Sequence, residues 1–268
     1  MNTIAIDKLS ASHGARPALH DICLSFIPGE VTVIAGPNGC GKSTLLRCLA
    51  RLHRPDAGTI RIGSKNVWSL PGRDSARLIA MLPQAPVTPE GITVSALVRY
   101  GRHPHQGLLR QWSADDERAV QQAMRDTGTS ALAARPLSQL SGGQRQRCWL
   151  AMALAQETPV LLLDEPTSML DLGHQVEVLD LVRQLARAGR TVVMVLHDLG
   201  AAARYGDTLV AMRGGRVAAS GRPGSVVTAA LVRDLYGIEA DILAAPHDGA
   251  PLVVPVARQP RLYAVNQA

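Results

Sequence analysis

Apolar positions along the chain fall into two strand patterns. Residues 4–9 and 19–27 alternate apolar with polar side chains, as half-buried antiparallel strands do. Further along, short stretches are apolar throughout, which is typical of strands buried in a parallel sheet. The pattern therefore predicts an antiparallel N-terminal sheet and a second, buried sheet. The continuous stretches are residues 31–35, 79–82, 160–163 and 191–196.

Turn signals add two further strand segments. Residues 55–58 form a Pro- and Gly-containing turn before a short strand over residues 59–62. The pair Gly214-Gly215 separates two apolar stretches, which is a strong signal for a two-residue hairpin. The expected hairpin strands are residues 208–213 and 216–219.

Helical spacing of apolar residues predicts the helices. From about residue 85 to residue 140 the strand pattern disappears, and residues 93–100 are expected to form a helix. A second helix runs from Ser113 to about Thr127, because Ser113 and Asp116 form a capping-box pattern. Three later helices are predicted over residues 140–156, over residues 175–188 on Val176, Leu179, Val182 and Leu185, and over residues 229–236.

These elements define the expected domain organisation. The chain is predicted to be α/β, with one main domain over residues 1–240. A helical subdomain at about residues 85–157 is inserted into this domain. Residues 241–268 are rich in Pro and Ala and are expected to form a C-terminal tail, with one apolar piece at residues 252–256.

Composition limits the function classes. No apolar run approaches the roughly 18 residues that a membrane-spanning helix needs, and residues 1–10 lack a signal-peptide core, so no export is expected. The net charge is +6, but the charges are scattered and aromatic residues are only 3% of the chain, which disfavours a nucleic-acid partner. Four cysteines, without metal-ligand spacing, suit a reducing cytosol: Cys23, Cys40, Cys48 and Cys148.

A glycine-rich loop lies between the predicted strand at residues 31–35 and the next helical pattern. It matches G-x-x-x-x-G-K-[ST], in which glycines let backbone N–H groups converge on phosphate and the helix N-terminus adds its dipole. Lys42 supplies a cation and Ser43 a hydroxyl ligand for Mg²⁺. The alternative is a glycine-rich turn with a solvated Lys. The loop comprises Gly36, Pro37, Asn38, Gly39, Cys40, Gly41, Lys42, Ser43 and Thr44.

Two carboxylates, Asp164 and Glu165, end the predicted strand at residues 160–163. Parallel sheets place ligands at the carboxyl ends of their strands. Asp164 is therefore expected to hold Mg²⁺ through water, and Glu165 to polarise a water that attacks the γ-phosphate. The alternative is a strand that simply ends in solvated acids.

A second anion site is predicted where Leu140 leads into a helix. Ser141, Gly142, Gly143 and Gln144 place a hydroxyl and two glycines at the helix N-terminus. One nucleotide does not need two phosphate sites on one chain unless the second serves another molecule. This site therefore predicts a head-to-tail, two-fold dimer with ATP between its subunits. A simple helix cap is the alternative.

Taken in order, these motifs resemble the nucleotide-binding subunit of an ATP-binding cassette (ABC) transporter over about residues 4–237. The resemblance implies a P-loop NTPase core of mixed sheet with an antiparallel N-terminal subdomain and an inserted helical subdomain, with ATP and Mg²⁺ as ligands. It further implies that Gln84 touches Mg²⁺ and the membrane partner, that Asp171 communicates across the dimer, and that His197 contacts the γ-phosphate. In the family an aromatic residue near position 13 stacks on adenine. This chain has His13 there, and a surface turn is the alternative.

Residues 100–106 and 170–180 are similar to ATPases of importers for ferric siderophores, haem or cobalamin. The resemblance implies ATP hydrolysis that powers uptake of such a chelate. The implied partners are a second ATPase subunit forming a homodimer, membrane permease subunits and, indirectly, a solute-binding protein. The implied location is peripheral, on the cytoplasmic face of the inner membrane.

Two other functions remain open from the sequence. A soluble cassette ATPase of DNA repair or translation would usually carry a long coiled-coil insertion or tandem cassettes, and neither is present in the sequence. A metabolic P-loop kinase would not need residues 140–144. Glu165 disfavours a module that only binds nucleotide.

The thiol of Cys40 forms a separate expectation. If exposed beside Lys42, it should be the most reactive of the four cysteines, and MgATP should protect it, while Cys23, Cys48 and Cys148 react slowly. The alternative is that Cys40 is a small residue turned inward.

Overall fold

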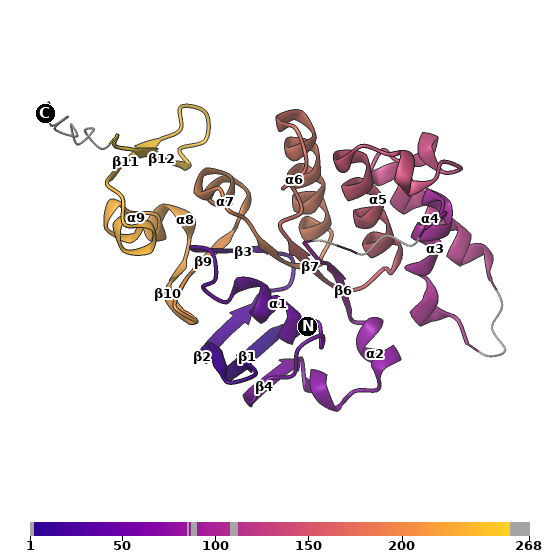
Figure 1. Ribbon diagram of the computed structural model, residues 1–268, viewed down its shortest axis with the longest axis horizontal. Helices are drawn as coiled ribbons and strands as arrows, with labels where there is room; N and C mark the ends of the chain where they lie inside the picture. Colours follow the sequence, from indigo (N-terminus) through magenta and orange to yellow (C-terminus); the bar gives the residue numbers. More distant parts are fainter. Residues whose placement is uncertain (1–2, 85, 87–89, 108–111, 258–268) are drawn as a thin grey trace, which may run out of the picture.

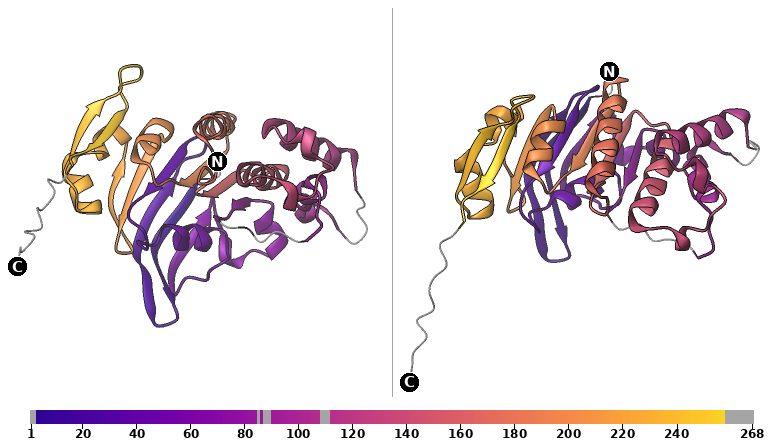
Figure 2. Two further views of the ribbon diagram at one scale, coloured as in Figure 1. Left: turned by 45° about the horizontal axis from the view of Figure 1, so that its top comes forward. Right: turned by 90° about the horizontal axis from the view of Figure 1, so that it is seen from above.

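The computed structural model describes residues 3–84, 86, 90–107 and 112–257. Figure 1 shows a central mixed sheet, with an antiparallel sheet on one side and helices α6 and α7 on the other. Helices α3, α4 and α5 lie at one end of the molecule and the hairpin β11–β12 at the opposite end (Figures 1 and 2). Within these residues, no helix has both the length and the apolar character needed to cross a membrane.

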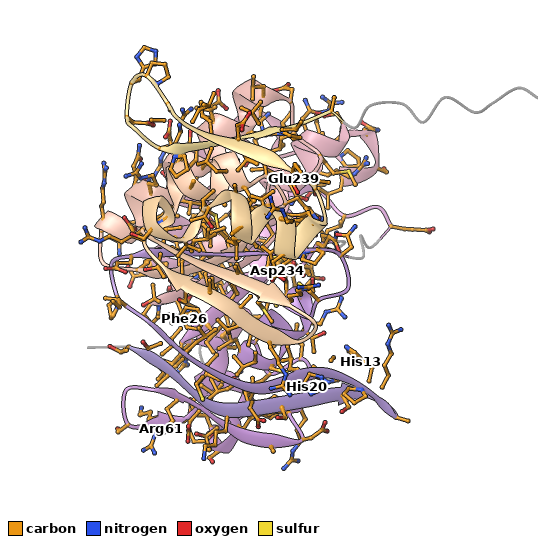
Figure 3. The ribbon with its side chains drawn as sticks, turned by 90° about the vertical axis from the view of Figure 1, so that its left-hand side faces the viewer. His13, His20, Phe26, Arg61, Asp234 and Glu239 are labelled. Atoms are coloured by element: carbon orange, nitrogen blue, oxygen red, sulfur yellow. The ribbon has the colours of Figure 1, made fainter. Side chains whose placement is uncertain are left out.

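The antiparallel sheet forms as the alternating pattern predicts. Its order is β2-β1-β4-β5, and Ile4, Leu9 and Phe26 on its inner face are 1% exposed or less. Phe26 lies between this sheet and the mixed sheet (Figure 3). The strands are β1 (Ile4–His13), β2 (Arg16–Phe26), β4 (Ala57–Ile62) and β5 (Lys65–Asn66).

The mixed sheet has the order β10-β9-β3-β8-β7-β6 and is parallel except for the pair β9–β10. Every residue of β3, β7 and β8 is buried, which explains their continuous apolar sequences. The carboxyl ends of β3, β7 and β8 therefore meet at one edge. The strands are β3 (Val31–Ala35), β6 (Ile79–Leu82), β7 (Val160–Asp164), β8 (Thr191–Val195), β9 (Thr208–Arg213) and β10 (Arg216–Gly221).

Helix α1 (Lys42–Leu49) joins the two sheets into one core. Leu45, Leu46 and Leu49 are essentially unexposed and pack with residues of both sheets. Burying three leucines contributes several kcal/mol, at about 1.5–3 kcal/mol for each. The helix that begins at the glycine-rich loop is therefore held between the antiparallel sheet and the mixed sheet. A short 3₁₀ turn (Val67–Ser69) and α2 (Gly72–Ala76) then connect β5 to β6.

Between β6 and β7 the described residues form helices, and their β pairing is limited to one isolated bridge between Thr93 and Pro136. The capping box predicted at Ser113 and Asp116 is present. Arg102, 3% exposed, donates to Asp116 at 2.9 Å and to Glu157 at 2.7 Å. The elements are α3 (Val94–Tyr100), α4 (Ala114–Asp126), α5 (Gly142–Ala155) and 3₁₀ turns at His103–His105, Ser130–Leu132 and Leu137–Gln139.

Helix α6 (Leu172–Arg187) begins three residues before the predicted start. The side chain of Asp171 caps it by accepting from the His174 N–H at 2.9 Å. Its buried positions are Val178, Leu179, Val182 and Ala186. The prediction that Val176 belongs to the buried face was wrong, because the face is set by the helix's rotation against β3 and β8, which leaves Val176 42% exposed.

The expected C-terminal tail, residues 241–268, forms a β-hairpin over part of its length, where no strands were predicted from the sequence. The strands β11 (Ala240–Ala244) and β12 (Pro251–Pro255) pair antiparallel in register from Ala240 with Pro255 to Ala244 with Pro251. Ile242 and Val253 pack against the main core, which stabilises a hairpin too small to be stable alone. Residues 258–268 of the tail lie outside the described residues. The helices before it are α7 (Leu199–Tyr205), α8 (Pro223–Val226) and α9 (Ala229–Tyr236), the last as predicted.

Candidate functional site

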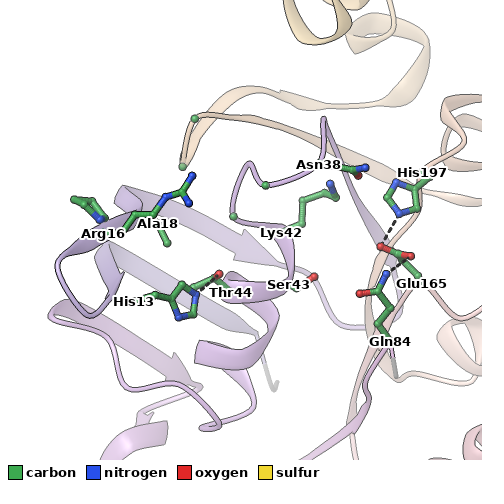
Figure 4. A pocket seen from close by; sticks show the side chains of 15 residues that line it. His13, Arg16, Ala18, Asn38, Lys42, Ser43, Thr44, Gln84, Glu165 and His197 are labelled. Atoms are coloured by element: carbon green, nitrogen blue, oxygen red, sulfur yellow. Dashed lines mark hydrogen bonds and ion pairs between the residues drawn. The ribbon is translucent and has the colours of Figure 1, made fainter. Parts of the chain in front are cut away.

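A cavity of about 740 Å³ opens at the edge where β3, β7 and β8 end. Figure 4 shows His13 and Arg16 at one end of it, Gln84, Glu165 and His197 at the other, and the glycine-rich loop between them. Of the residues expected to touch nucleotide or metal, its wall contains His13, Asn38, Gly39, Gly41, Lys42, Ser43, Thr44, Gln84, Glu165 and His197.

The glycine-rich loop takes a backbone path that needs glycine. Gly41 has a φ of 104°, and a Cβ there would lie 2.7 Å from the Ala18 carbonyl oxygen. At Gly36 a Cβ would lie 2.1 Å from the Met212 carbonyl oxygen. The loop is therefore packed against β2 and β9, and only residues without a side chain fit at these two positions.

Lys42 brings a nearly buried ammonium into this loop. The side chain is 5% exposed, and its Nζ donates to the carbonyl oxygens of Gly36 at 2.8 Å and Pro37 at 3.0 Å. Such a cation, held on a loop at the N-terminus of α1, provides the positive charge that phosphate binding requires.

Ser43 and Asp164 form a hydrogen-bonded pair beside Lys42. The Ser43 hydroxyl donates to Asp164 Oδ1 at 3.1 Å, and Asp164 is 1% exposed. Burial raises the pKa of Asp164 above its ordinary value. The hydrogen bond from Ser43 lowers this pKa and the negative charge of Glu165 raises it, and the net shift is upward. A buried carboxylate and a hydroxyl are hard oxygen donors, and a divalent cation would offset the cost of keeping the carboxylate charged. The donor set thus fits Mg²⁺.

Glu165 lies at the centre of a three-residue network. It is 8% exposed; its Oε2 accepts from the Gln84 amide at 2.7 Å, and its Oε1 lies 2.6 Å from His197 Nε2 as an ion-pair contact. Its φ of 54° is a conformation that costs a non-glycine residue about 1–2 kcal/mol. Strain of this kind, at a buried acid inside a cavity, is typical of functional residues.

His13 lies at the end of β1, where it lines the opposite end of the cavity. Its Nε2 is 3.1 Å from the Thr44 hydroxyl (Figure 4). The ring is thus tied to the first turn of α1 rather than free on a surface turn, although its role toward adenine stays a prediction.

The residues of the second predicted anion site lie away from this cavity. Ser141 and Gln144 form a capping box at the start of α5, with the Gln144 N–H donating to the Ser141 hydroxyl at 3.2 Å. Gly142 and Gly143 are next to Met169, and Asp171 is at the start of the following helix. None of these helix-start residues is among those that line the cavity of their own chain.

The cavity wall also contains five residues that were not predicted from the sequence to belong to the site: Arg16, Pro17, Ala18, Gly214 and Gly215. The Gly215 N–H donates to the Cys40 carbonyl oxygen at 3.0 Å, which fixes the β9–β10 turn to the glycine-rich loop. The Gly214-Gly215 pair was recognisable as a hairpin signal. Its position beside the loop depends on the pairing of β3 with β9, for which the sequence carries no local signal.

The prediction of a reactive Cys40 was wrong, and the inward-facing alternative holds. Cys40 is 3% exposed and packs in the core beneath the loop, where burial raises the pKa of its thiol although Lys42 opposes the shift. Its side chain turns inward because the loop's backbone faces the cavity. Cys23, which was expected to react slowly, is the exposed thiol among the four.

We therefore expect brief alkylation at about pH 8 to label Cys23 first. Burial raises the pKa of Cys48 to about 12 and that of Cys148 to about 11, so fewer than about one in a hundred of either thiol is ionised at that pH. Peptide mapping should show that MgATP leaves the labelling of Cys23 unchanged and that the labelled protein keeps its ATPase activity. Faster labelling of Cys40 than of Cys23 would contradict the buried placement, and Cys23→Ser provides the control.

Comparison with known proteins adds independent information. The family model described as "ABC transporter" matches residues 19–168. The chain is 45% identical to the ferric enterobactin transport ATP-binding protein FepC of Escherichia coli (strain K12), over 94% of this chain and 93% of that protein. A metal-chelate type ABC transporter solved in an inward-facing conformation superposes with a TM-score of 0.83 at 27% identity, covering 96% of this chain and 99% of that one. A dimeric bacterial ABC transporter cassette superposes at 0.74 and 26% identity, covering 82% and 98%.

Proposed function

This chain belongs to the ABC transporter family as an ATP-hydrolysing subunit that uses ATP with Mg²⁺, and from this we propose that it powers the import of an iron chelate. The observation that carries the proposal is that the glycine-rich loop and the residues Gln84, Glu165 and His197 line one cavity, with Asp164 hydrogen-bonded to the lining residue Ser43. Together they provide a phosphate site, a metal ligand and a buried base within one volume. The proposed domain organisation is a main ATPase domain over residues 1–240, with a helical subdomain at about residues 85–157 inserted in it and a C-terminal tail over residues 241–268.

The proposed chemistry is in-line attack of water on the γ-phosphate. The backbone N–H groups of residues 38–44 and the Lys42 ammonium would bind and orient the phosphates, while Ser43, Asp164 and Gln84 are the residues that would hold Mg²⁺. When bound, the metal neutralises charge on the phosphate oxygens. Glu165 would orient the water and accept its proton, and His197, whose Nε2 is 2.6 Å from Glu165 Oε1, would contact the γ-phosphate.

The proposed working unit is a two-fold homodimer. Ser141, Gly143 and the helix start of α5 are exposed or half-buried and lie outside the cavity of their own chain, which supports a role at the nucleotide of a partner copy. The similar cassette of known dimeric structure supports this arrangement. ATP would close the dimer, and hydrolysis would reopen it.

The proposed cargo is an iron chelate of the siderophore, haem or cobalamin type. Support comes from the similarity to a ferric enterobactin transport protein and to a metal-chelate type transporter, each over more than nine-tenths of this chain. Import would require membrane permease subunits, reached through Gln84 and the helical subdomain, and a solute-binding protein on the far side. The proposed location is therefore peripheral, on the cytoplasmic face of the inner membrane.

The test is reconstitution with candidate permease subunits. We expect the purified complex in liposomes to transport an iron-loaded siderophore only when MgATP is present on the side of the membrane that carries this chain. We also expect its ATPase rate to rise when the solute-binding protein and cargo are added. Copurification with DNA-repair or ribosomal components in place of a membrane protein would instead support the soluble cassette ATPase. Transport of cargo outward would overturn the import assignment while leaving the ATPase assignment in place.

A further inference from the structure

His53 contacts the back of His13, the residue at the end of the cavity away from Lys42. The two imidazole rings lie with centroids 4.5 Å apart and planes tilted by 45°. His53 Nε2 is 3.0 Å from the Ser12 carbonyl oxygen. Because a carbonyl oxygen only accepts, this Nε2 carries the proton and donates. His53 is thus fixed to the backbone next to His13 and to the ring of His13 at the same time.

His13 is an exposed residue next to Gly14, at the tip of the β1–β2 hairpin. The Thr44 hydroxyl restrains its ring at one nitrogen, and packing against His53 adds a second restraint. An imidazole also offers a smaller face for stacking than a phenol or an indole. A ring that rotated freely would lose conformational entropy on stacking, which would weaken binding of the base.

The helix α1 connects this ring pair to the phosphate site. Lys42 begins the helix, Thr44 in its first turn contacts His13, and the chain just after its last turn carries His53. The backbone N–H of His53 donates to the Arg47 carbonyl oxygen at 3.1 Å, which holds this segment on the end of the helix. The spacing between the phosphate loop and the His13 ring is therefore set by one rigid element.

We propose that His53 is a positioning residue that holds the His13 ring in the orientation on which the nucleotide base stacks. The platform for the base is then a histidine pair supported from behind, in place of a single large aromatic ring. This inference rests on the proposed ATP site. It makes a specific claim: His53 contributes to binding of the base and not to binding of the phosphates.

The experiment compares two ligands, ATP and inorganic tripolyphosphate, which has no base. In His53→Ala we expect the dissociation constant and the KM for ATP to rise about fivefold, as partial loss of the stacking of one base would produce. The kcat at saturating ATP should stay within twofold of the wild-type value. The affinity for tripolyphosphate, measured by calorimetry or by competition, should stay within twofold. His247→Ala, at an exposed histidine on the β11–β12 loop, is the control for general effects of removing an imidazole.

A second set of variants tests whether His53 acts through His13. His13→Ala should weaken ATP binding about tenfold, and adding His53→Ala to it should cost nothing more. His53→Phe should retain most of the wild-type affinity because it keeps a ring behind His13, and His13→Tyr should make ATP binding insensitive to His53→Ala. Melting temperatures separate these effects from a loss of folded protein.

Three results would overturn the inference. They are unchanged ATP affinity in His53→Ala, an equal loss of tripolyphosphate affinity, or a penalty that persists in the His13→Ala background. A wild-type protein that bound neither ATP nor tripolyphosphate would instead remove the proposed function itself. The two failures are thus distinguishable.

Discussion

Glu165→Gln should abolish steady-state ATP hydrolysis while leaving ATP bound. The carboxylate lines the cavity, accepts from Gln84 at 2.7 Å and lies 2.6 Å from His197 Nε2, so an amide of the same size can keep the packing and part of the network. An amide cannot accept a proton from the attacking water. Loss of a positioned general base costs about a hundredfold to ten-thousandfold in rate, so we expect a fall of at least a hundredfold.

The variant should also accumulate as an ATP-bound dimer, because closure requires binding and only hydrolysis reopens it. Size-exclusion chromatography with and without MgATP measures this, and the hydrolysis rate is measured on the same sample. Glu177→Gln, the same change at an exposed position of α6, is the matched control and should behave as wild type. A rate within tenfold of wild type in Glu165→Gln would show that another group activates the water.

Local sequence signals predicted most of the elements. Strand β3 and helix α9 have the predicted bounds, and the Gly214-Gly215 turn forms the predicted hairpin. In each case the information is contained in a few neighbouring residues: a β-branched run, helical spacing, or a glycine pair. Ser113 and Ser141 are the N-cap residues of α4 and α5, as expected for serine at a helix start.

Elements that depend on tertiary packing were not predictable in this way. The hairpin β11–β12 is too small to be stable alone and is stabilised by contacts of Ile242 and Val253 with distant parts of the core. The buried face of α6 shifts from Val176 to Val178 because the helix's rotation is set by the sheet beneath it. Neither contact leaves a signal in the neighbouring sequence.

The candidate site shows the same division. The ordered motifs indicated the residues that gather at the carboxyl edge of the mixed sheet, since parallel strands must end there together. The wall formed by Arg16 and Gly215 could not be inferred, because it depends on how closely the N-terminal sheet approaches the glycine-rich loop. The direction of the Cys40 side chain was likewise decided by the core beneath the loop. The contact between His13 and His53 joins residues 40 positions apart in the sequence, so it depends on the fold and has no local sequence signal.

Gly143→Asp should block dimer closure without weakening nucleotide binding by the monomer. Gly143 lies near the start of α5 and does not line the cavity proposed for the nucleotide of its own chain. In the proposed dimer this helix start faces the partner's γ-phosphate, so an aspartate would place one anion against another. At an effective dielectric constant of about 20, two unit charges about 4 Å apart repel by ~4 kcal/mol, which corresponds to a thousandfold loss in the closure equilibrium.

The structure provides a steric control for this change. A Cβ at Gly143 would lie 3.2 Å from Leu170 Cδ2 and 3.3 Å from the Met169 carbonyl oxygen, so any side chain there requires a small shift. Gly143→Ala adds this crowding without the charge and should retain ATP-driven dimerisation. In the Glu165→Gln background, we expect the dimer to form with Gly143→Ala and to be absent with Gly143→Asp, while monomer affinity for ATP stays within twofold in both. Because the aspartate would contact only the partner's nucleotide, an equal loss of monomer affinity would place this helix start at the nucleotide of its own chain and remove the argument for a shared site.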